Sequence, residues 1–238
     1  MNSLDRLRVK LFADGANVST MLEMHALPYI KGLTTNPTLM RKAGIANYRS
    51  FAKDVLSQIK NKPVCFEVLA DDLAEMERQA MEIAGWADNV FVKIPVTNTK
   101  RETCRTLVKR LSDRQVKLNV TAIMTLAQVR DIAASLNPGI PSYLSVFAGR
   151  IADTGIDPVP LMCQAVEILK SNSHAELVWA SSREIFNIFQ ADAAGCHVIT
   201  VTNDILKKIS IVGYDLTEYS LDTVKMFYDD AQTSGFTL

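Results

Sequence analysis

The stretch Asn89-Val-Phe-Val-Lys-Ile-Pro-Val-Thr97 holds one lysine, Lys93, in a run of apolar residues. These apolar residues are mostly β-branched or aromatic, which predicts a strand that is buried on both faces. Lysine is rarely buried unless its charge is paired, so the strand either pairs this charge or uses the amine. Burial disfavours the ammonium form, and a neutral amine can form a Schiff base with a ketone. Pro95 ends the strand two residues later, which places Lys93 at its C-terminal end.

Length and composition suit one ordinary globular domain. A chain of 238 residues is long enough for a single α/β barrel, and 48% hydrophobic residues supply an ample core. The formal net charge is zero, with 26 basic and 26 acidic residues, which argues against nucleic acid or an anionic membrane as a partner. No apolar run approaches membrane-spanning length. The four cysteines are scattered, which predicts small core residues in a reducing cytoplasm and no zinc or redox pair.

Strand-like and helix-like segments alternate about eight times along the chain. The predicted strands are residues 9–13, 32–35, 63–69, 89–97, 116–120, 142–147, 176–180 and 197–201. The predicted helices, caps included, are residues 18–26, 48–59, 71–84, 101–111, 125–136, 158–169, 183–194 and 203–209. This alternation predicts one (β/α)8 barrel over residues 1–238. A doubly wound sheet would carry a glycine-rich turn after the first strand, and Asp14-Gly-Ala-Asn17 lacks that pattern.

Polar residues stand at the C-terminal ends of the predicted strands, where barrels of this kind carry their active sites. They are Asp14, Thr34, Asn36, Glu67, Lys93, Asn119, Thr121, Ser145, Arg150, Ser181 and Arg183. Several have a purely structural alternative: Asn36 could belong to a turn, Ser181 could cap a helix, and Glu67 could be a hydrogen-bonded core carboxylate. Together they bring a lysine, carboxylates, amides and arginines to one end of the barrel, which favours a catalytic site.

The sequence resembles the transaldolase family, in particular the short-chain branch that also contains fructose-6-phosphate aldolases. The matching segments are Phe12-Ala-Asp14, Gly32-Leu-Thr-Thr-Asn-Pro37, Phe66-Glu-Val68, Val92-Lys-Ile-Pro-Val-Thr97, Leu118-Asn-Val-Thr-Ala122, Ser145-Val-Phe-Ala-Gly-Arg150 and Ala180-Ser-Ser-Arg183. The resemblance implies a Schiff-base enzyme that cleaves a ketose phosphate, fructose 6-phosphate or sedoheptulose 7-phosphate. It would pass the dihydroxyacetone unit to an aldose phosphate, as in the pentose phosphate pathway. No metal or cofactor is implied, because the iminium acts as the electron sink.

The resemblance also assigns roles to the catalytic residues. Lys93 would attack the ketone carbon, and Asp14 would act as acid and base at the C4 hydroxyl. Glu67 and Thr121 would hold a water molecule for the proton transfers that form and dehydrate the carbinolamine. These four residues form the expected catalytic set.

The expected substrate-binding residues are Thr34, Asn36, Asn119, Ser145, Phe147, Arg150, Ser181 and Arg183. By the resemblance, the amides of Asn36 and Asn119 would bind the hydroxyls of the dihydroxyacetone unit. Arg150 and Arg183 would bind the substrate phosphate, because a guanidinium suits bidentate contact with phosphate oxygens. The two serines, Ser145 and Ser181, would assist at that end.

Two positions favour a transaldolase over an aldolase within the family. Glu67 stands where the aldolase branch carries glutamine, and Phe147 stands where that branch carries tyrosine. Val146 and Ser182 depart from the family pattern near the phosphate end of the site, replacing a common proline and a larger residue. The alternatives are an aldolase that releases free dihydroxyacetone, a Schiff-base barrel acting on a keto acid, and a sugar-phosphate-binding barrel without catalysis.

The C-terminal segment, residues 213–238, follows the eighth predicted strand and its helix. A helix over residues 221–231 would carry Leu221, Val224, Phe227 and Tyr228 on one face. The outer ring of the barrel is already complete, so this stripe needs either the chain's own barrel or a neighbouring subunit. In the short transaldolases that the chain resembles, this helix packs on a neighbour. We therefore expect a homo-oligomer, a decamer of two pentameric rings, with Phe227 and Tyr228 in the contact.

Overall fold

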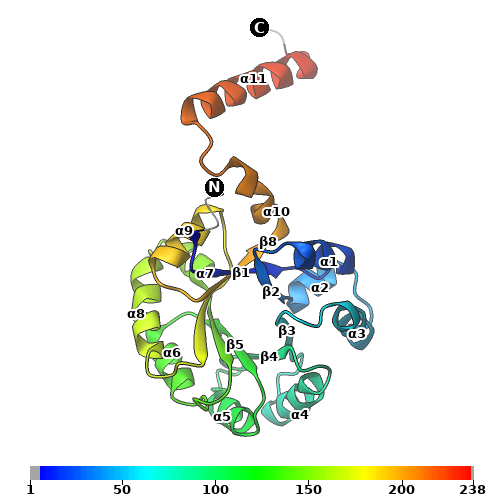
Figure 1. Ribbon diagram of the computed structural model, residues 1–238, viewed down its shortest axis with the longest axis vertical. Coiled ribbons are helices and arrows are strands. Elements are labelled where there is room, and N and C mark those ends of the chain that lie inside the picture. Colours follow the sequence, from blue (N-terminus) through cyan, green and yellow to red (C-terminus); the bar gives the residue numbers. More distant parts are fainter. Residues whose placement is uncertain (1–5, 237–238) are drawn as a thin grey trace.

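The computed structural model describes residues 6–236 and shows a closed barrel of eight parallel strands in chain order (Figure 1). The strands are β1 Lys10–Asp14, β2 Ile30–Thr34, β3 Val64–Glu67, β4 Val90–Pro95, β5 Leu118–Ile123, β6 Ser142–Val146, β7 Ala175–Trp179 and β8 Val198–Thr202. Strand β8 pairs with β1 along its whole length, from Lys10 opposite Val198 to Asp14 opposite Thr202. This pairing closes the sheet and confirms the predicted (β/α)8 barrel.

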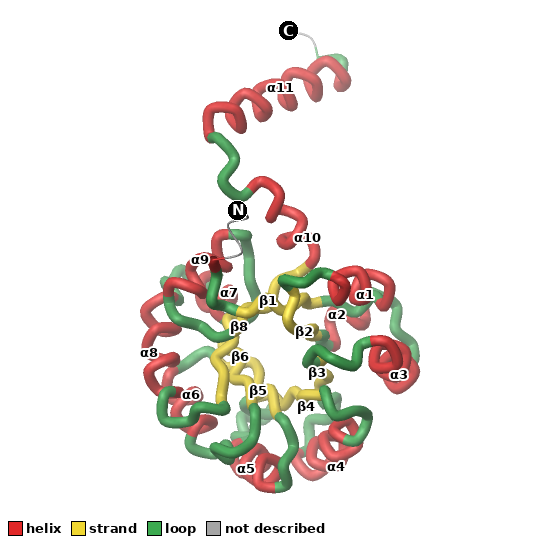
Figure 2. The backbone as a smooth tube through the Cα atoms, viewed as in Figure 1, coloured by secondary structure: helices red, strands yellow, loops and turns green. Residues whose placement is uncertain are grey.

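Helices form a ring around the strands (Figure 2). The helices of the structure are α1 Val18–Ala26, α2 Pro37–Lys42, α3 Tyr48–Gln58, α4 Leu73–Ala84, α5 Arg105–Asp113, α6 Leu126–Ala133, α7 Ala148–Ala152, α8 Val159–Leu169, α9 Phe186–Ala193, α10 Asn203–Leu206, a 3₁₀ helix Lys207–Ile211, and α11 Leu216–Ser234. The last of them, α11, lies outside this ring. In the part of the chain that the structure describes, no helix combines the length and apolarity needed to cross a membrane.

The helix α4 illustrates how sequence signals set the outer ring. The Asp72 carboxylate accepts the amides of Ala74 and Glu75 at 3.0 Å each, which satisfies donors that the first helical turn leaves free. Met76 and Ile83 are buried along one face at helical spacing, facing the barrel. The predicted cap is therefore present, and the helix carries an apolar stripe toward the barrel.

Alternation of side chains along the strands divides the barrel interior into two levels. Phe12, Cys65, Phe91, Tyr143, Val178 and Val198 form a buried cluster inside the barrel. The Phe91 and Tyr143 rings lie 4.5 Å apart between centroids, and Phe12 contacts Tyr143 edge-on at 5.4 Å. Because successive strand residues face opposite sides, the residue two places further along each strand also faces inward. The aromatic cluster thus forms a floor, and the polar residues above it form a site.

Two predicted helices begin later than expected. The helix expected from residue 101 begins at Arg105, because Arg101 adopts φ of 66° in a turn preceding it. The helix expected from residue 183 begins at Phe186. The Asn187 side chain accepts the amides of Arg183 and Glu184, which holds this segment as a separate turn.

The short helices differ most from what the sequence predicts. The helices α2 and α7 were not predicted, although Asn36 followed by proline is a helix-start signal and Asn36 does cap α2. The predicted helix at 203–209 is divided into α10 and the 3₁₀ helix that follows it. Asn203 is the first residue of α10 and not its cap, which is Thr202.

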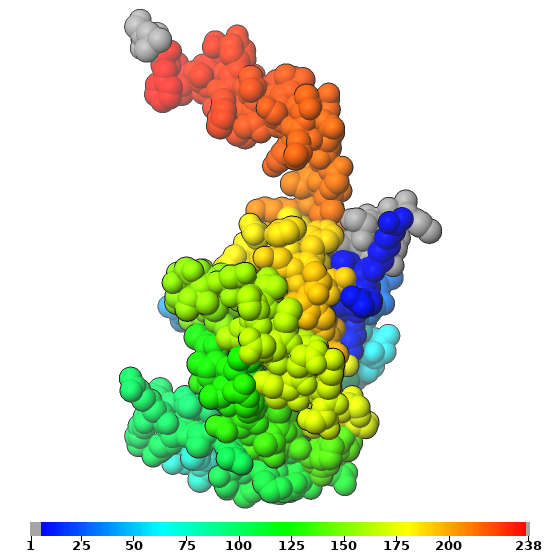
Figure 3. Space-filling model, turned by 90° about the vertical axis from the view of Figure 1, so that its left-hand side faces the viewer, coloured from blue at the N-terminus to red at the C-terminus, as the bar shows by residue number. Residues whose placement is uncertain are grey.

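The C-terminal helix α11 extends beyond the predicted residues 221–231 at both ends. It projects away from the barrel instead of folding back across it (Figure 3). No residue along it is buried, and the aromatic side chains of Phe227 and Tyr228 are 63% and 64% exposed. A helix with this much exposed apolar surface lacks a partner within its own chain.

Candidate active site

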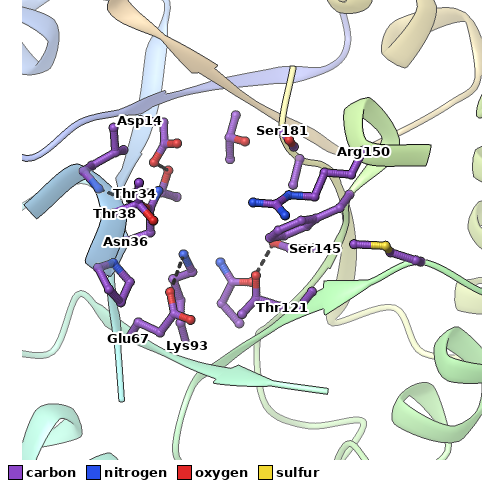
Figure 4. A pocket seen from close by; sticks show the side chains of 18 residues that line it. Asp14, Thr34, Asn36, Thr38, Glu67, Lys93, Thr121, Ser145, Arg150 and Ser181 are labelled. Atoms are coloured by element: carbon purple, nitrogen blue, oxygen red, sulfur yellow. Dashed lines mark hydrogen bonds and ion pairs between the residues drawn. The ribbon is translucent and has the colours of Figure 1, made fainter. Parts of the chain in front are cut away.

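A cavity of about 500 Å³ opens at the C-terminal ends of the strands (Figure 4). The structure gathers around it the residues that the sequence singled out, except one: Asp14, Thr34, Asn36, Glu67, Lys93, Asn119, Thr121, Ser145, Phe147, Arg150 and Ser181. The exception is Arg183. Further lining residues that sequence reasoning missed are Pro37, Thr38, Leu39, Ala122, Met124, Ala180 and Thr200. Strand alternation was a usable signal for Thr200, which lies two residues after the floor residue Val198.

Lys93 lies inside the barrel, one level above the aromatic floor, and is only 7% exposed. Its Nζ lies 3.1 Å from Glu67 Oε2 and donates a hydrogen bond to the Thr35 carbonyl oxygen at 2.8 Å. The strands enforce the first contact, because Glu67 on β3 stands opposite Lys93 on β4 in the register. The charge of Lys93 is therefore paired, and both members of the pair line the cavity.

Asp14 ends β1 and faces the cavity opposite these groups (Figure 4). The Thr34 hydroxyl donates a hydrogen bond to its Oδ1 at 2.8 Å. Burial raises the pKa of the Asp14 carboxyl, while the positive charge of Lys93 and the Thr34 hydrogen bond partly offset that rise. The negative charge of Glu67 raises the pKa slightly further. A carboxyl whose pKa is raised in this way is suited to gain and lose a proton during a reaction.

Amide and hydroxyl groups on neighbouring strands fix one another's orientation. Ser145 Oγ donates to Asn119 Oδ1 at 2.7 Å, and Asn119 Nδ2 contacts the Cys65 sulfur at 3.4 Å. Burial raises the pKa of the Cys65 thiol to about 11, so this cysteine stays a neutral thiol near pH 7. Asn36 uses its side-chain oxygen to cap α2 at the Leu39 amide. Its NH₂ group remains a donor for a ligand.

Thr121 carries a buried hydroxyl for which the described residues offer no hydrogen-bond partner. Leaving such a group unpaired costs about 1–3 kcal/mol, so a water molecule or a substrate oxygen is the natural partner. Thr121 lies on β5 next to β4, which carries Lys93. Thr121 and Lys93 both line the cavity.

Arg150 and Ser181 come together at one side of the cavity. The Arg150 guanidinium lies 5.6 Å from the centre of the Phe147 ring, within range of a cation–π contact. A Cβ atom at Gly149 would lie 1.6 Å from the Ser181 carbonyl oxygen, so only glycine permits this approach. Ser181 itself adopts φ of 64°, and the cap of α9 is Ile185. Ser181 therefore faces the cavity and does not cap the helix.

Arg183 lies outside the cavity lining. Its Nε donates to Asp153 Oδ1 at 3.1 Å, and its Nη2 pairs with Asp153 Oδ2. Two further positions, Val146 and Ser182, depart from the family pattern. Val146 is fully buried in β6, and the Ser182 hydroxyl donates to the Thr200 carbonyl at 2.7 Å, tying the loop after β7 to β8.

The side chains of residues 6–236 form no group of three or more His, Cys, Asp or Glu that could hold a metal ion. The polar groups that line the cavity are the lysine, the two carboxylates, the Arg150 guanidinium, the amides and the hydroxyls described above.

Comparison with known proteins identifies relatives that match nearly the whole chain. A family model described as Transaldolase/Fructose-6-phosphate aldolase matches residues 11–238. A probable transaldolase of Dehalococcoides mccartyi is 33% identical over 202 residues, which are 84% of this chain and 90% of that protein. A probable transaldolase of Thermoanaerobacter sp. is 34% identical over 220 residues, covering 91% and 95%.

A solved structure shows the same fold at a greater distance. Dihydrodipicolinate synthase from Rhodopseudomonas palustris superposes with a TM-score of 0.57 over 90% of this chain and 79% of that one. Its sequence identity is 14%, so the likeness concerns the barrel alone. The family match instead extends over nearly the whole sequence. By its sequence, this chain belongs to the transaldolase/fructose-6-phosphate aldolase family.

Proposed function

We propose that this chain is a transaldolase that moves a dihydroxyacetone unit from a ketose phosphate to an aldose phosphate through a Schiff base on Lys93. The observation that carries the proposal is the pair of the buried Lys93 and the partly buried Glu67, 3.1 Å apart, facing Asp14 across one cavity. A nucleophile, a proton acceptor beside it and a second carboxyl group are the parts that the reaction needs. Fructose 6-phosphate and sedoheptulose 7-phosphate are the proposed donors.

The first half of the reaction makes the iminium. Glu67, directly or through a water molecule held with Thr121, takes a proton from the Lys93 ammonium, and the amine attacks the ketone carbon. The carbinolamine then loses its hydroxyl as water, for which Glu67 returns the proton. The product is an iminium that carries a positive charge next to the bond to be broken.

The second half breaks and remakes a carbon–carbon bond. The Asp14 carboxylate takes the proton of the C4 hydroxyl, the C3–C4 bond breaks, and its electron pair moves into the enamine on Lys93. The released aldose leaves, and an acceptor aldehyde then reacts in the reverse sense, with Asp14 returning the proton. Hydrolysis of the new iminium restores the lysine. The Asn36 and Asn119 amides would hold the hydroxyls of the three-carbon unit meanwhile.

The Phe147 side chain in the cavity lining favours transfer over simple cleavage. Release of free dihydroxyacetone requires a proton at C3, and the Phe147 side chain in the cavity lining has no hydroxyl to assist such a step. The test is product formation from fructose 6-phosphate with and without an aldose phosphate acceptor. A transaldolase needs the acceptor for turnover. Equal rates with and without an acceptor would establish the aldolase alternative. If no ketose gives a borohydride adduct, the alternative of a sugar-phosphate-binding barrel without catalysis would hold.

We propose the cytoplasm as the location of this reaction. All four cysteines are free in the structure, and three of them are buried, which suits a reducing compartment.

Arg150 is proposed to bind the substrate phosphate. Arg150→Gln is expected to lower kcat/KM for phosphorylated donors by roughly 1.5–3 kcal/mol of transition-state binding, because one hydrogen bond to a charged group is lost. A donor without a phosphate, such as fructose, should change little. Steady-state kinetics on both donor types makes the measurement, and Arg130→Gln, an exposed arginine in the last turn of α6, is the matched control. Equal losses on both donor types would contradict the assignment.

The helix α11 is proposed to pack on a neighbouring subunit in a homo-oligomer, which we expect to be a decamer of two pentameric rings. Its exposed apolar residues and its distance from its own barrel support this. A chain ending at Gly213 should lose the assembly, as measured by light scattering. Phe227→Asp, which keeps the full length, should weaken it as well. A monomeric mass for the intact chain, or an unchanged mass after truncation, would contradict the proposal.

A further inference from the structure

We propose that Asp153 is a positioning residue that sets how strongly the site prefers phosphorylated substrates, because it holds the Arg183 guanidinium away from the cavity. The proposal rests on the function proposed above and concerns its anion-binding end. It assigns a role to a carboxylate that lies outside the cavity lining and acts on the substrate only through another residue.

The contact between the two side chains is bidentate. Arg183 presents its Nε and Nη2 edge to both carboxylate oxygens of Asp153, the Nε contact measuring 3.1 Å. The two side chains are 48% and 52% exposed. Solvent screens an exposed pair of this kind, so its formation is worth little and a competing anion can displace it.

The backbone of Arg183 is fixed, so only the outer part of its side chain can move. The Asn187 Oδ1 atom accepts the amide of Arg183 at 2.8 Å and that of Glu184 at 3.2 Å. A Cβ at Gly149 would lie 3.2 Å from Arg183 Cγ, which shows that the arginine stem crosses Gly149. The neighbouring residue in the chain is Arg150, which does line the cavity. The stem thus already lies next to the proposed phosphate position.

The position of the guanidinium then depends on which anion attracts it. Asp153 follows Arg150 by three residues and is the C-cap of α7, a spacing that places both on one side of the short helix. A phosphate bound at Arg150 and Ser181 carries close to two negative charges, whereas Asp153 carries one. A phosphorylated substrate can therefore draw Arg183 from Asp153, at the cost of breaking that pair. A substrate without phosphate leaves the pair intact.

Replacing the carboxylate tests this competition. In Asp153→Asn, the KM for a phosphorylated donor is expected to fall about two- to fivefold, the size of one exposed ion pair, with kcat unchanged. The KM for fructose, which lacks the phosphate, should not move, and raising the salt concentration should reduce the difference between variant and parent. Asp153→Glu, which keeps the charge, should behave like the parent. Asp157→Asn is the matched control. The Val159 amide donates a hydrogen bond to Asp157 Oδ1 at 2.9 Å, and the side-chain oxygen of asparagine can accept the same bond.

A double-mutant cycle with Arg183→Gln identifies the residue through which Asp153 acts. In the Arg183→Gln background, Asp153→Asn should have no further effect on the KM of the phosphorylated donor. Three outcomes would overturn the proposal: an unchanged or raised KM in Asp153→Asn, an equal change on both donor types, or an effect that persists without Arg183.

Calorimetry with inorganic phosphate measures anion binding without relying on catalysis. Tighter phosphate binding by Asp153→Asn supports the role even if the parent transfers no sugar, and unchanged binding overturns it.

Discussion

Replacing Lys93 with arginine is expected to abolish both turnover and borohydride trapping of a ketose phosphate. Arginine keeps a positive charge beside Glu67, but its guanidinium stays protonated and cannot attack a ketone. The covalent route then disappears completely, which makes this the largest effect that a single substitution can have here. Mass spectrometry after borohydride reduction measures the adduct, and a coupled assay measures turnover.

The matched control for Lys93 is another lysine on a barrel strand. Lys10 lies at the start of β1 and pairs with Glu176 at 2.6 Å, at the end of the barrel away from the cavity. Lys10→Arg should retain both the adduct and turnover. Because arginine is larger than lysine, Lys93→Met, with circular dichroism to check folding, separates a lost nucleophile from a disturbed barrel. An adduct that persists in Lys93→Arg and maps to another lysine would contradict the mechanism.

The position of the candidate site could be predicted from the sequence because a barrel imposes a simple rule on its strands. Residues of one parity face the interior, and those nearest the C-terminal ends reach the cavity. Phe91 and Lys93 on β4 obey this rule, as do Phe12 and Asp14 on β1. The spacing between a large apolar residue and a polar one is visible in the sequence without any knowledge of the contacts. Which residues are catalytic remains a proposal that rests on the family resemblance and on the geometry.

The loops could not be predicted in the same way, because long-range contacts determine them. The position of Ser181 depends on a close approach to Gly149, from a different loop. The direction of the Arg183 side chain depends on Asp153, thirty residues earlier. None of these contacts has a local pattern in the sequence. The C-terminal helix is similar, since periodicity located its apolar stripe but left open which surface it would face.

Replacing Asp14 with asparagine is expected to lower kcat by roughly 10²- to 10⁴-fold, the usual contribution of a general acid or base. Asparagine keeps the shape and can still accept the Thr34 hydrogen bond, which measures 2.8 Å in the parent. It cannot take a proton from the C4 hydroxyl. Lys93 should still form its iminium, so borohydride trapping should persist while transfer is lost. Loss of trapping together with turnover would mean that Asp14 acts before the carbon–carbon bond breaks.

The pH dependence of kcat provides a second test of Asp14. Burial raises the pKa of this carboxyl above its usual value of 3.8, and the reaction begins with its carboxylate form. Activity should therefore be present above the raised pKa and be lost as the pH falls through it. The Thr34 hydrogen bond lowers the pKa, so Thr34→Val, which removes the donor but keeps the shape, should move this loss of activity to higher pH. In Asp14→Asn the residual activity should no longer show that acid-side fall. A pH profile unchanged by Thr34→Val would assign the titration to a different group, since only a carboxyl that accepts the Thr34 hydroxyl is sensitive to its removal.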